Sequence, residues 1–180
     1  MDNQFQAIAS EYDQYYKSLF QKGRLPLKST AKGFWGYSIA EEVYELFKKI
    51  KLEQYKSFVD LGSGDGKVVL IASLFTKAIG IEIDEELVRK SEEMKAKLNL
   101  NRAHFLQKDF FQEDLSSYEA IYLFPDQRTR AVEDKLLKEM KGILLFMGQQ
   151  FRPLRLKEVK QQFLSLTPFT VYTNPEQKHL

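Results

Sequence analysis

The residues best suited to chemistry lie in one stretch of this chain, Phe58 to Val69, which reads FVDLGSGDGKVV. Asp60 ends an apolar run, and Gly62, Gly64 and Gly66 follow at alternate positions. Glycine adopts backbone angles that other residues avoid, and it lets a ligand approach the main chain without meeting a Cβ atom. Apolar residues then resume. The stretch predicts a strand, a ligand-binding glycine loop and a helix, the layout of nucleotide sites in doubly wound sheets.

Three ligand classes can be compared with this spacing. A phosphate-binding P-loop needs a glycine where the chain has Leu61 and Ser or Thr where it has Val68. A dinucleotide fingerprint needs G-x-G-x-x-G, whereas the chain has G-x-G-x-G with an acid two positions earlier. That pattern resembles motif I of class I S-adenosylmethionine (SAM)-dependent methyltransferases. SAM has no pyrophosphate, and its methionine end carries an ammonium group that a nearby carboxylate can bind. The alternative is a glycine-rich turn without a ligand.

A second acid supports this interpretation. The segment from Ala78 to Asp84 predicts the next strand, and Glu82 near its end lies 22 residues after Asp60. In such folds an acid at this separation holds the ribose hydroxyls. The acids from Asp84 to Glu86 instead suit the start of the following helix. We therefore predict that Glu82 is the ribose ligand.

Composition limits the possible classes of protein. The chain has 180 residues, a formal net charge of +2 and no cysteine. This length suits one domain, and the nearly neutral charge implies no general attraction to nucleic acid. Without cysteine there is no disulfide, thiolate metal site or cysteine nucleophile, and no metal site is predicted. No apolar stretch approaches 18 residues and no signal peptide is evident, so we expect a cytoplasmic protein with no membrane partner.

Strands and helices alternate along the chain. This order predicts an α/β fold, a Rossmann-like, doubly wound and mostly parallel sheet with an N-terminal helical extension. The expected helices are Phe5–Phe20, Ala40–Leu52, Lys67–Phe75, Asp84–Leu98, Arg128–Lys141 and Leu154–Leu164. The expected strands are Phe58–Leu61, Ala78–Asp84, Ala103–Leu106, Tyr118–Phe124, Ile143–Met147 and Phe169–Thr173. Glycines and a proline predict an irregular segment over residues 23–33. Residues 1–36 are expected to form a helix and basic connector ahead of a SAM-binding domain over residues 37–180.

A longer resemblance extends from Tyr37 to about Phe151. Over this range the chain resembles small class I SAM-dependent methyltransferases, most closely archaeal protein-lysine methyltransferases and their mitochondrial relatives. The matching segments are DLGSGDGK (60–67), GIEID (80–84), KDFFQEDLS (108–116), IYLFPD (121–126), KLLKEMKG (135–142) and GQQF (148–151). Two segments depart from the pattern. Gly36 to Ile39 replaces a Tyr-Val-Pro-Thr-like segment, and GQQF replaces an SHEF-like segment, so its acid and histidine are absent. Both departures concern the substrate side.

The resemblance implies roles for individual residues. The glycine loop would contact the methionine part and the ribose of SAM. Glu82 would hold the ribose diol, and Asp109 would accept a hydrogen bond from the adenine amino group. Leu123, Phe124 and Pro125 would form the floor under the transferred methyl group. Asp109 has an alternative role as a turn acid after the third strand. The implied cofactor residues are Asp60, Gly62, Ser63, Gly64, Asp65, Gly66, Glu82, Ile83, Asp109, Phe110 and Leu123.

A lysine acceptor must lose a proton before it attacks a methyl group. At neutral pH this costs roughly 4–5 kcal/mol unless the site lowers its pKa. An aromatic pocket lowers that pKa by desolvation, and Trp35, Tyr37, Tyr122 and Phe124 could build one. Tyr37 and Asp126 are candidate catalytic residues that orient the acceptor or relay its proton. Their alternatives are an anchoring aromatic for Tyr37 and a helix N-cap for Asp126.

The segment after the fourth strand narrows the range of possible methyl acceptors. It reads Phe124-Pro125-Asp126-Gln127 rather than the Asn/Asp-Pro-Pro-aromatic motif of enzymes that methylate base amines or glutamine amides. Neither His104 nor His179 is placed to act as a base. The main hypothesis is a SAM-dependent methyltransferase acting on protein lysine. The alternatives are an RNA methyltransferase, a SAM-binding module acting on a small molecule, and an inactive binder. The RNA alternative depends on one basic face formed by the run Lys17–Lys32 with Arg128, Arg130, Arg152, Arg155, Lys157 and Lys160.

Overall fold

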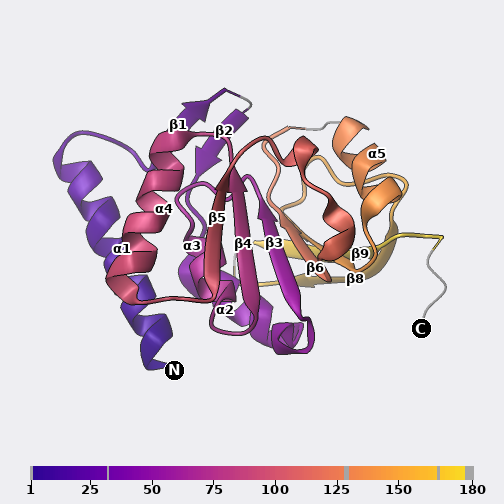
Figure 1. Ribbon diagram of the computed structural model, residues 1–180, viewed down its shortest axis with the longest axis horizontal. Coiled ribbons are helices and arrows are strands. Elements are labelled where there is room, and N and C mark those ends of the chain that lie inside the picture. The colour runs from indigo at the N-terminus through magenta and orange to yellow at the C-terminus, as the bar shows by residue number, and fades with distance from the viewer. Residues whose placement is uncertain (1, 32, 128–129, 166, 177–180) are drawn as a thin grey trace.

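The computed structural model describes residues 2–31, 33–127, 130–165 and 167–176. Within these ranges the chain forms a seven-stranded sheet with helices on both faces and a separate two-stranded hairpin (Figure 1). The helices are α1 (Asn3–Gln21), α2 (Ala40–Lys49), α3 (Lys67–Ala72), α4 (Glu85–Leu98) and α5 (Arg130–Glu139). The strands are β1 (Leu27–Thr30), β2 (Gly33–Gly36), β3 (Ser57–Leu61), β4 (Lys77–Glu82), β5 (Ala103–Gln107), β6 (Ala120–Leu123), β7 (Ile143–Met147), β8 (Lys157–Phe163) and β9 (Pro168–Thr173).

The strand order in the described sheet is β5-β4-β3-β6-β7-β9-β8. The first five strands of this order are parallel, and β9 runs antiparallel between β7 and β8. The predicted α/β fold with a mostly parallel sheet is therefore confirmed. Chain order reverses at β3, whose neighbours are β4 on one side and β6 on the other. Such a reversal leaves a crevice outside the carboxyl ends of the strands, where ligands bind in open α/β sheets.

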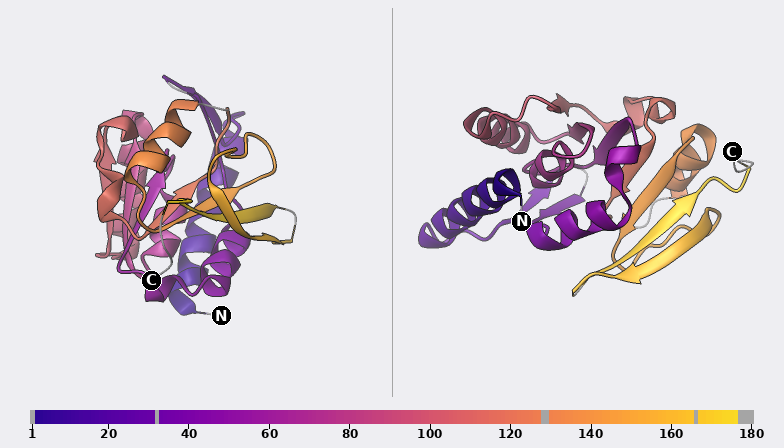
Figure 2. Two further views of the ribbon diagram at one scale, coloured as in Figure 1. Left: turned by 90° about the vertical axis from the view of Figure 1, so that its right-hand side faces the viewer. Right: turned by 90° about the horizontal axis from the view of Figure 1, so that it is seen from below.

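The two faces of the sheet carry different layers, which Figure 2 shows from two further directions. Side chains of α1, α2 and α3 pack with Phe58 and Tyr122 on one face. On the other face, Leu136 and Met140 pack with Val59, Leu61 and Ile121. Alternation along β3 and β6 sends successive side chains into opposite layers. Because α3 is wedged between the sheet and α1 and α2, all six of its residues are buried, its lysine included.

Helix α1 follows its sequence pattern closely. Its buried residues are Phe5, Ile8, Tyr12, Tyr16 and Leu19, which recur at helical spacing. The helix begins after Asp2, whose side chain accepts from the backbone N–H of Gln4. Phe20 was expected on the same face and is instead 54% exposed. It lies in the last turn of α1, next to the buried Leu19, with its side chain toward solvent.

Two predictions of secondary structure are wrong. Residues 154–164 do not form a helix, because 157–163 form strand β8, which pairs with β9. Nearly all side chains of β8 are exposed, so backbone pairing with β9, rather than side-chain periodicity, determines its conformation. Residues 23–33 are also more regular than expected, since β1 and β2 pair as an antiparallel hairpin. Among the described residues, no helix has the length and apolar character needed to cross a membrane.

Candidate functional site

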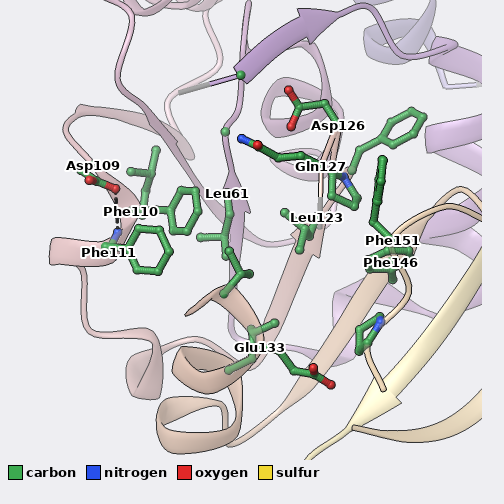
Figure 3. Close-up of a pocket in the computed structure, with 18 of the residues that line it drawn as sticks. Leu61, Asp109, Phe110, Phe111, Leu123, Asp126, Gln127, Glu133, Phe146 and Phe151 are labelled. Atoms are coloured by element: carbon green, nitrogen blue, oxygen red, sulfur yellow. Dashed lines mark hydrogen bonds between the residues drawn. The ribbon is translucent and has the colours of Figure 1, made fainter. Parts of the chain in front are cut away.

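A cavity of about 670 Å³ lies at the carboxyl ends of β3, β4, β5 and β6. Each of these strands, or the residues directly after it, contributes to the wall, together with the hairpin, α5 and the loop between β7 and β8. The predicted cofactor residues that line it are Gly62, Glu82, Ile83, Asp109, Phe110 and Leu123. Figure 3 shows Phe110 and Leu123 on either side of Leu61, and Asp126 beside the hairpin. The structure therefore brings together side chains that are more than 60 residues apart in the sequence.

The three glycines of the loop have different surroundings. All have positive φ, at +80° for Gly62, +55° for Gly64 and +83° for Gly66. A Cβ atom added to Gly62 would meet nothing within 4 Å, so this glycine faces open space. At Gly64 it would overlap the Trp35 ring, and at Gly66 it would lie 2.5 Å from the Ser91 hydroxyl. Only Gly62 thus leaves room for a ligand in this conformation.

Glu82 connects the end of β4 to the glycine loop. One carboxylate oxygen accepts from the backbone N–H of Gly64 at 2.9 Å. The other accepts from the N–H groups of Ile83 and Asp84 at 2.8 and 2.9 Å. The side chain is buried yet lines the cavity. Its acid therefore has a fixed position at the cavity wall, which suits a ligand with hydroxyl groups.

Asp60 alternates with Val59 and Leu61 along β3, so its side chain points to the other face of the sheet, and it does not line the cavity. Burial raises the pKa of its carboxyl well above the usual value, and the carboxylates of Glu82 and Asp65 raise it further. Among the described residues, none donates a hydrogen bond to the Asp60 side chain. A buried carboxylate with no donor is costly unless a ligand supplies one. Asp60 is therefore suited to a cationic group at the end of β3.

Asp109 and two phenylalanines follow β5. The Asp109 side chain accepts from the backbone N–H of Phe111 at 3.0 Å and so begins a short 3-10 helix. The rings of Phe110 and Phe111 stack with centroids 4.7 Å apart. All three residues line the cavity (Figure 3). The turn role considered for Asp109 is thus present, and the same residue also stands at the cavity wall.

The rest of the glycine loop is held from behind by α1. Tyr12 donates to the backbone oxygen of Asp65, and Tyr16 donates to its carboxylate, each at 2.6 Å. Close to Asp65, the Lys67 ammonium lies over the Tyr16 and Tyr37 rings. Sequence reasoning did not find these contacts. The available signal was two tyrosines one helical turn apart on a buried face, because buried hydroxyls need partners.

The two candidate catalytic residues lie in different places. Asp126 is at the mouth of the cavity, where its carboxylate accepts from the backbone N–H of Phe34 in the hairpin. Tyr37 is half exposed and contacts Tyr16 and Lys67 instead of the cavity. Tyr122 was expected in an acceptor pocket, and this is wrong. Its ring is buried with Phe58 on the other face of the sheet, because only alternate residues of β6 point toward the cavity.

The predicted basic face does not assemble. Helix α1, with Lys17, lies at one end of the described structure, and β8, with Lys157 and Lys160, lies toward the other (Figure 1), while the hairpin meets Arg130, Arg152 and Arg155 at the wall of the cavity. Several of its cations are also paired with acids: Lys28 with Asp84 and Glu86, Arg155 with Glu133 and Asp134, and Arg24 with Glu86. Lys32, Arg128 and His179 lie outside the described residues. His104 is exposed on β5 and lies away from the cavity.

Comparison with known proteins identifies the family. A family profile described as the ANTKMT methyltransferase domain matches residues 60–159, which is more than half of the chain. The chain belongs to this family. A protein-lysine N-methyltransferase of Saccharolobus islandicus (strain REY15A) is 29% identical over 114 residues, covering 61% of this chain and 71% of that protein.

Solved structures agree on the fold. An RNA methyltransferase from Salinibacter ruber, in complex with S-adenosyl-L-homocysteine, has a TM-score of 0.67 at 22% identity, covering 79% of this chain and 96% of that one. The putative methyltransferase yhhF from Escherichia coli has a TM-score of 0.58 at 16% identity, covering 76% and 84%. The chain is thus a class I SAM-dependent methyltransferase, with SAM as its cofactor. Its residues fit that cofactor, since Gly62 faces open space and the Glu82 carboxylate is held in a fixed position at the cavity wall.

Proposed function

We propose that this methyltransferase transfers a methyl group to a lysine side chain of a protein. The observation that carries the proposal is a group of apolar side chains beyond Leu123. Phe124, Phe146, Phe151 and Leu154 line the cavity there, beside the charged side chains of Asp126, Arg130, Glu133, Arg152 and Arg155. An amine that packs against these apolar side chains loses part of its hydration, and desolvation lowers the pKa of a lysine. The similarity to a protein-lysine N-methyltransferase supports the same acceptor.

The cofactor side of the proposal assigns the residues around the glycine loop. Bound SAM supplies a methyl group on a sulfonium, which is the electrophile of the reaction. Gly62 leaves room for the methionine part, and the Asp60 carboxylate, which lies behind the cavity wall near the end of β3, is assigned the attraction of its cationic group. Glu82 holds the ribose diol from the cavity wall. The residues assigned to the adenine and to the floor of the site are Ile83, Asp109, Phe110 and Leu123. Ser63, Gly64, Asp65 and Gly66 shape the loop.

The acceptor side of the proposal depends mainly on alignment. Displacement at a methyl group needs the attacking nitrogen in line with the leaving sulfur, and holding that geometry supplies much of the rate increase. Asp126 stands at the mouth of the cavity, where its carboxylate can attract the ammonium of an incoming lysine. Tyr37 contacts Lys67, so its proposed role is to position the hairpin that covers this mouth. The RNA alternative has less support, because α1 and β8, which carry part of its basic residues, lie toward opposite ends of the described structure.

The test is transfer of labelled methyl groups from SAM into an extract of the source organism. Aliquots are treated with protease or nuclease, and labelled protein is hydrolysed for amino-acid analysis. We expect label that is lost with protease and recovered as methyl-lysine, and much less label with the Glu82→Gln variant at the same, subsaturating SAM concentration. Label lost only with nuclease would contradict the lysine acceptor and favour RNA. Label confined to small molecules would contradict both.

A further inference from the structure

Helix α1 precedes residues 60–159, the part of the chain that matches the family, yet it bonds directly to the glycine loop. The Tyr12 hydroxyl donates to the backbone oxygen of Asp65 at 2.6 Å, and the Tyr16 hydroxyl donates to the Asp65 carboxylate at 2.6 Å. Residues four apart lie on the same face of a helix, so both hydroxyls reach one residue. Both tyrosines are buried, with exposed fractions of 1% and 6%. The helix thus fixes the backbone and the side chain of Asp65 together.

Lys67 extends this contact to the segment before α2. Its ammonium lies 4.5 Å from the centre of the Tyr16 ring, 5.2 Å from Tyr37 and 5.5 Å from Tyr12. It also donates to the backbone oxygen of Ser38. A desolvated ammonium over aromatic rings is attracted by their negative faces. One buried cation therefore joins α1, the glycine loop and the segment that follows the hairpin.

The hairpin itself crosses the glycine loop between two fixed points. At one end the Phe34 N–H donates to Asp126 after β6, and at the other Ser38 accepts from Lys67. Between them the Trp35 ring packs so closely on Gly64 that no Cβ atom would fit there. The position of Trp35 over the loop therefore depends on the contacts of Lys67 as well as on Asp126.

We propose that Tyr12, Tyr16 and Lys67 are positioning residues for the cofactor. They hold Asp65, and through it the glycine loop, in one geometry, and they keep the hairpin across that loop. The proposal rests on the SAM site described above. It predicts that substitutions of these residues change cofactor affinity and leave the acceptor compartment unchanged. The residues that line that compartment lie on β6 and β7, in the segments that follow them, and on α5.

The charge of Lys67 makes the contact sensitive to pH. Burial lowers the pKa of Lys67 to about 8, and the Asp65, Asp13 and Glu41 carboxylates that face it oppose this shift. As the pH rises through this value, the amine loses its attraction for the three tyrosine rings. In the unfolded chain the same group titrates at its ordinary value of 10.5. Between these values the unfolded chain binds more protons, so Lys67 itself favours folding increasingly as the pH rises. Weaker cofactor binding there would therefore reflect the missing attraction rather than unfolding driven by Lys67.

The experiment measures binding of SAM and S-adenosylhomocysteine by calorimetry for Tyr12→Phe, Tyr16→Phe and the double variant. Tyr15→Phe is the matched control, because Tyr15 lies on the same helix and its hydroxyl makes no hydrogen bond among the described residues. We expect each single variant to weaken binding about five- to tenfold, as loss of one buried hydrogen bond implies. The KM for SAM should rise while kcat and the acceptor KM stay near wild type. Trp35 is the single tryptophan of the chain, so its fluorescence should shift in the variants and not in the control.

The Lys67→Arg variant tests whether the loss of the positive charge at residue 67 causes the pH dependence of cofactor binding. Between pH 7 and 9 the wild type should lose cofactor affinity severalfold, whereas the arginine variant, which stays charged, should lose less. Both proteins bind the same ligand, so titration of SAM itself cancels in the comparison. Unchanged affinity and fluorescence in Tyr16→Phe, with only a lower Tm, would overturn the inference. A wild type that binds no SAM would instead overturn the cofactor site on which it rests.

Discussion

The two sides of the cavity differ in how their residues are held. On the glycine-loop side, Asp65 and Glu82 are buried and each accepts several hydrogen bonds. On the proposed acceptor side, Phe124 and Leu154 are 50% and 72% exposed. Clustered exposed apolar side chains on a folded protein commonly mark a binding surface. In the proposed assignment, the cofactor side is therefore formed in advance, and the acceptor side is completed by its partner.

The loop between β7 and β8 illustrates the acceptor side. Phe151 in this loop has a positive φ of +60°. The Glu133 carboxylate accepts from the backbone N–H groups of Leu154 and Arg155. The loop therefore depends on a neighbouring helix for its position, while its side chains line the cavity. Substitutions on the two sides should consequently affect different measurements.

The largest effect should come from a Cβ atom inside the glycine loop. Gly66→Ala combines a left-handed backbone, at roughly 1–3 kcal/mol, with overpacking against Ser91 and Phe105, at roughly 1–3 kcal/mol more. Gly23→Ala is the control, since Gly23 has φ +68° but nothing within 4 Å of its added Cβ. Thermal unfolding should show a much greater loss of Tm for Gly66→Ala. Equal losses would mean that close packing is unimportant at Gly66.

A large effect on cofactor affinity is expected from Glu82→Gln. The amide accepts fewer hydrogen bonds than the carboxylate and cannot hold a diol through two charged oxygens. Loss of bonds to a charged group, at about 1.5–3 kcal/mol, corresponds to a Kd for SAM about 10- to 100-fold weaker. Glu85→Gln, on the exposed first turn of α4, should leave the Kd unchanged. A Glu82→Gln protein with wild-type Kd would contradict the ribose role.

Phe124→Ala should affect the acceptor alone. Its ring lies at the cavity mouth and is half exposed, so its removal costs little packing energy. A few central anchor residues carry most of the binding energy of an interface. If Phe124 is such an anchor for the acceptor, its truncation at about 1.4 kcal/mol lowers kcat/KM for the protein acceptor about tenfold. The Kd for SAM should not change. The matched variant is Phe163→Ala, on exposed β8, and a similar loss of activity there would argue against a specific acceptor site.

The smallest effect is expected from Glu133→Gln. The amide oxygen can still accept from the loop, and nearby water can satisfy the remaining N–H group. We expect the free energy of unfolding to fall by about 1 kcal/mol and kcat/KM for the acceptor to fall modestly. Chemical denaturation and acceptor kinetics measure these two quantities. A change in SAM affinity as large as that of Glu82→Gln would contradict the separation between the two sides.

The wrong predictions have a common cause. The helix expected over residues 154–164 is a strand because β9 presents a free edge, which no local pattern reveals. Tyr122 points away from the cavity because its direction depends on which residue of β6 faces which layer. The basic face depended on α1 and β8 being neighbours, and the fold places them toward opposite ends of the described structure. In each case the deciding partner is distant in sequence.

The amino-acid sequence by itself determined the strand, glycine loop and helix from residue 58 onward, the acid at Glu82 and the alternating α/β order. These features arise from local backbone preferences and short-range periodicity, which a single chain displays directly. Only the tertiary structure decided that Trp35 lies on Gly64, that Gly62 faces the cavity, and that α1 bonds to Asp65. Those contacts join segments tens of residues apart, and their geometry exists only once the sheet has brought the segments together.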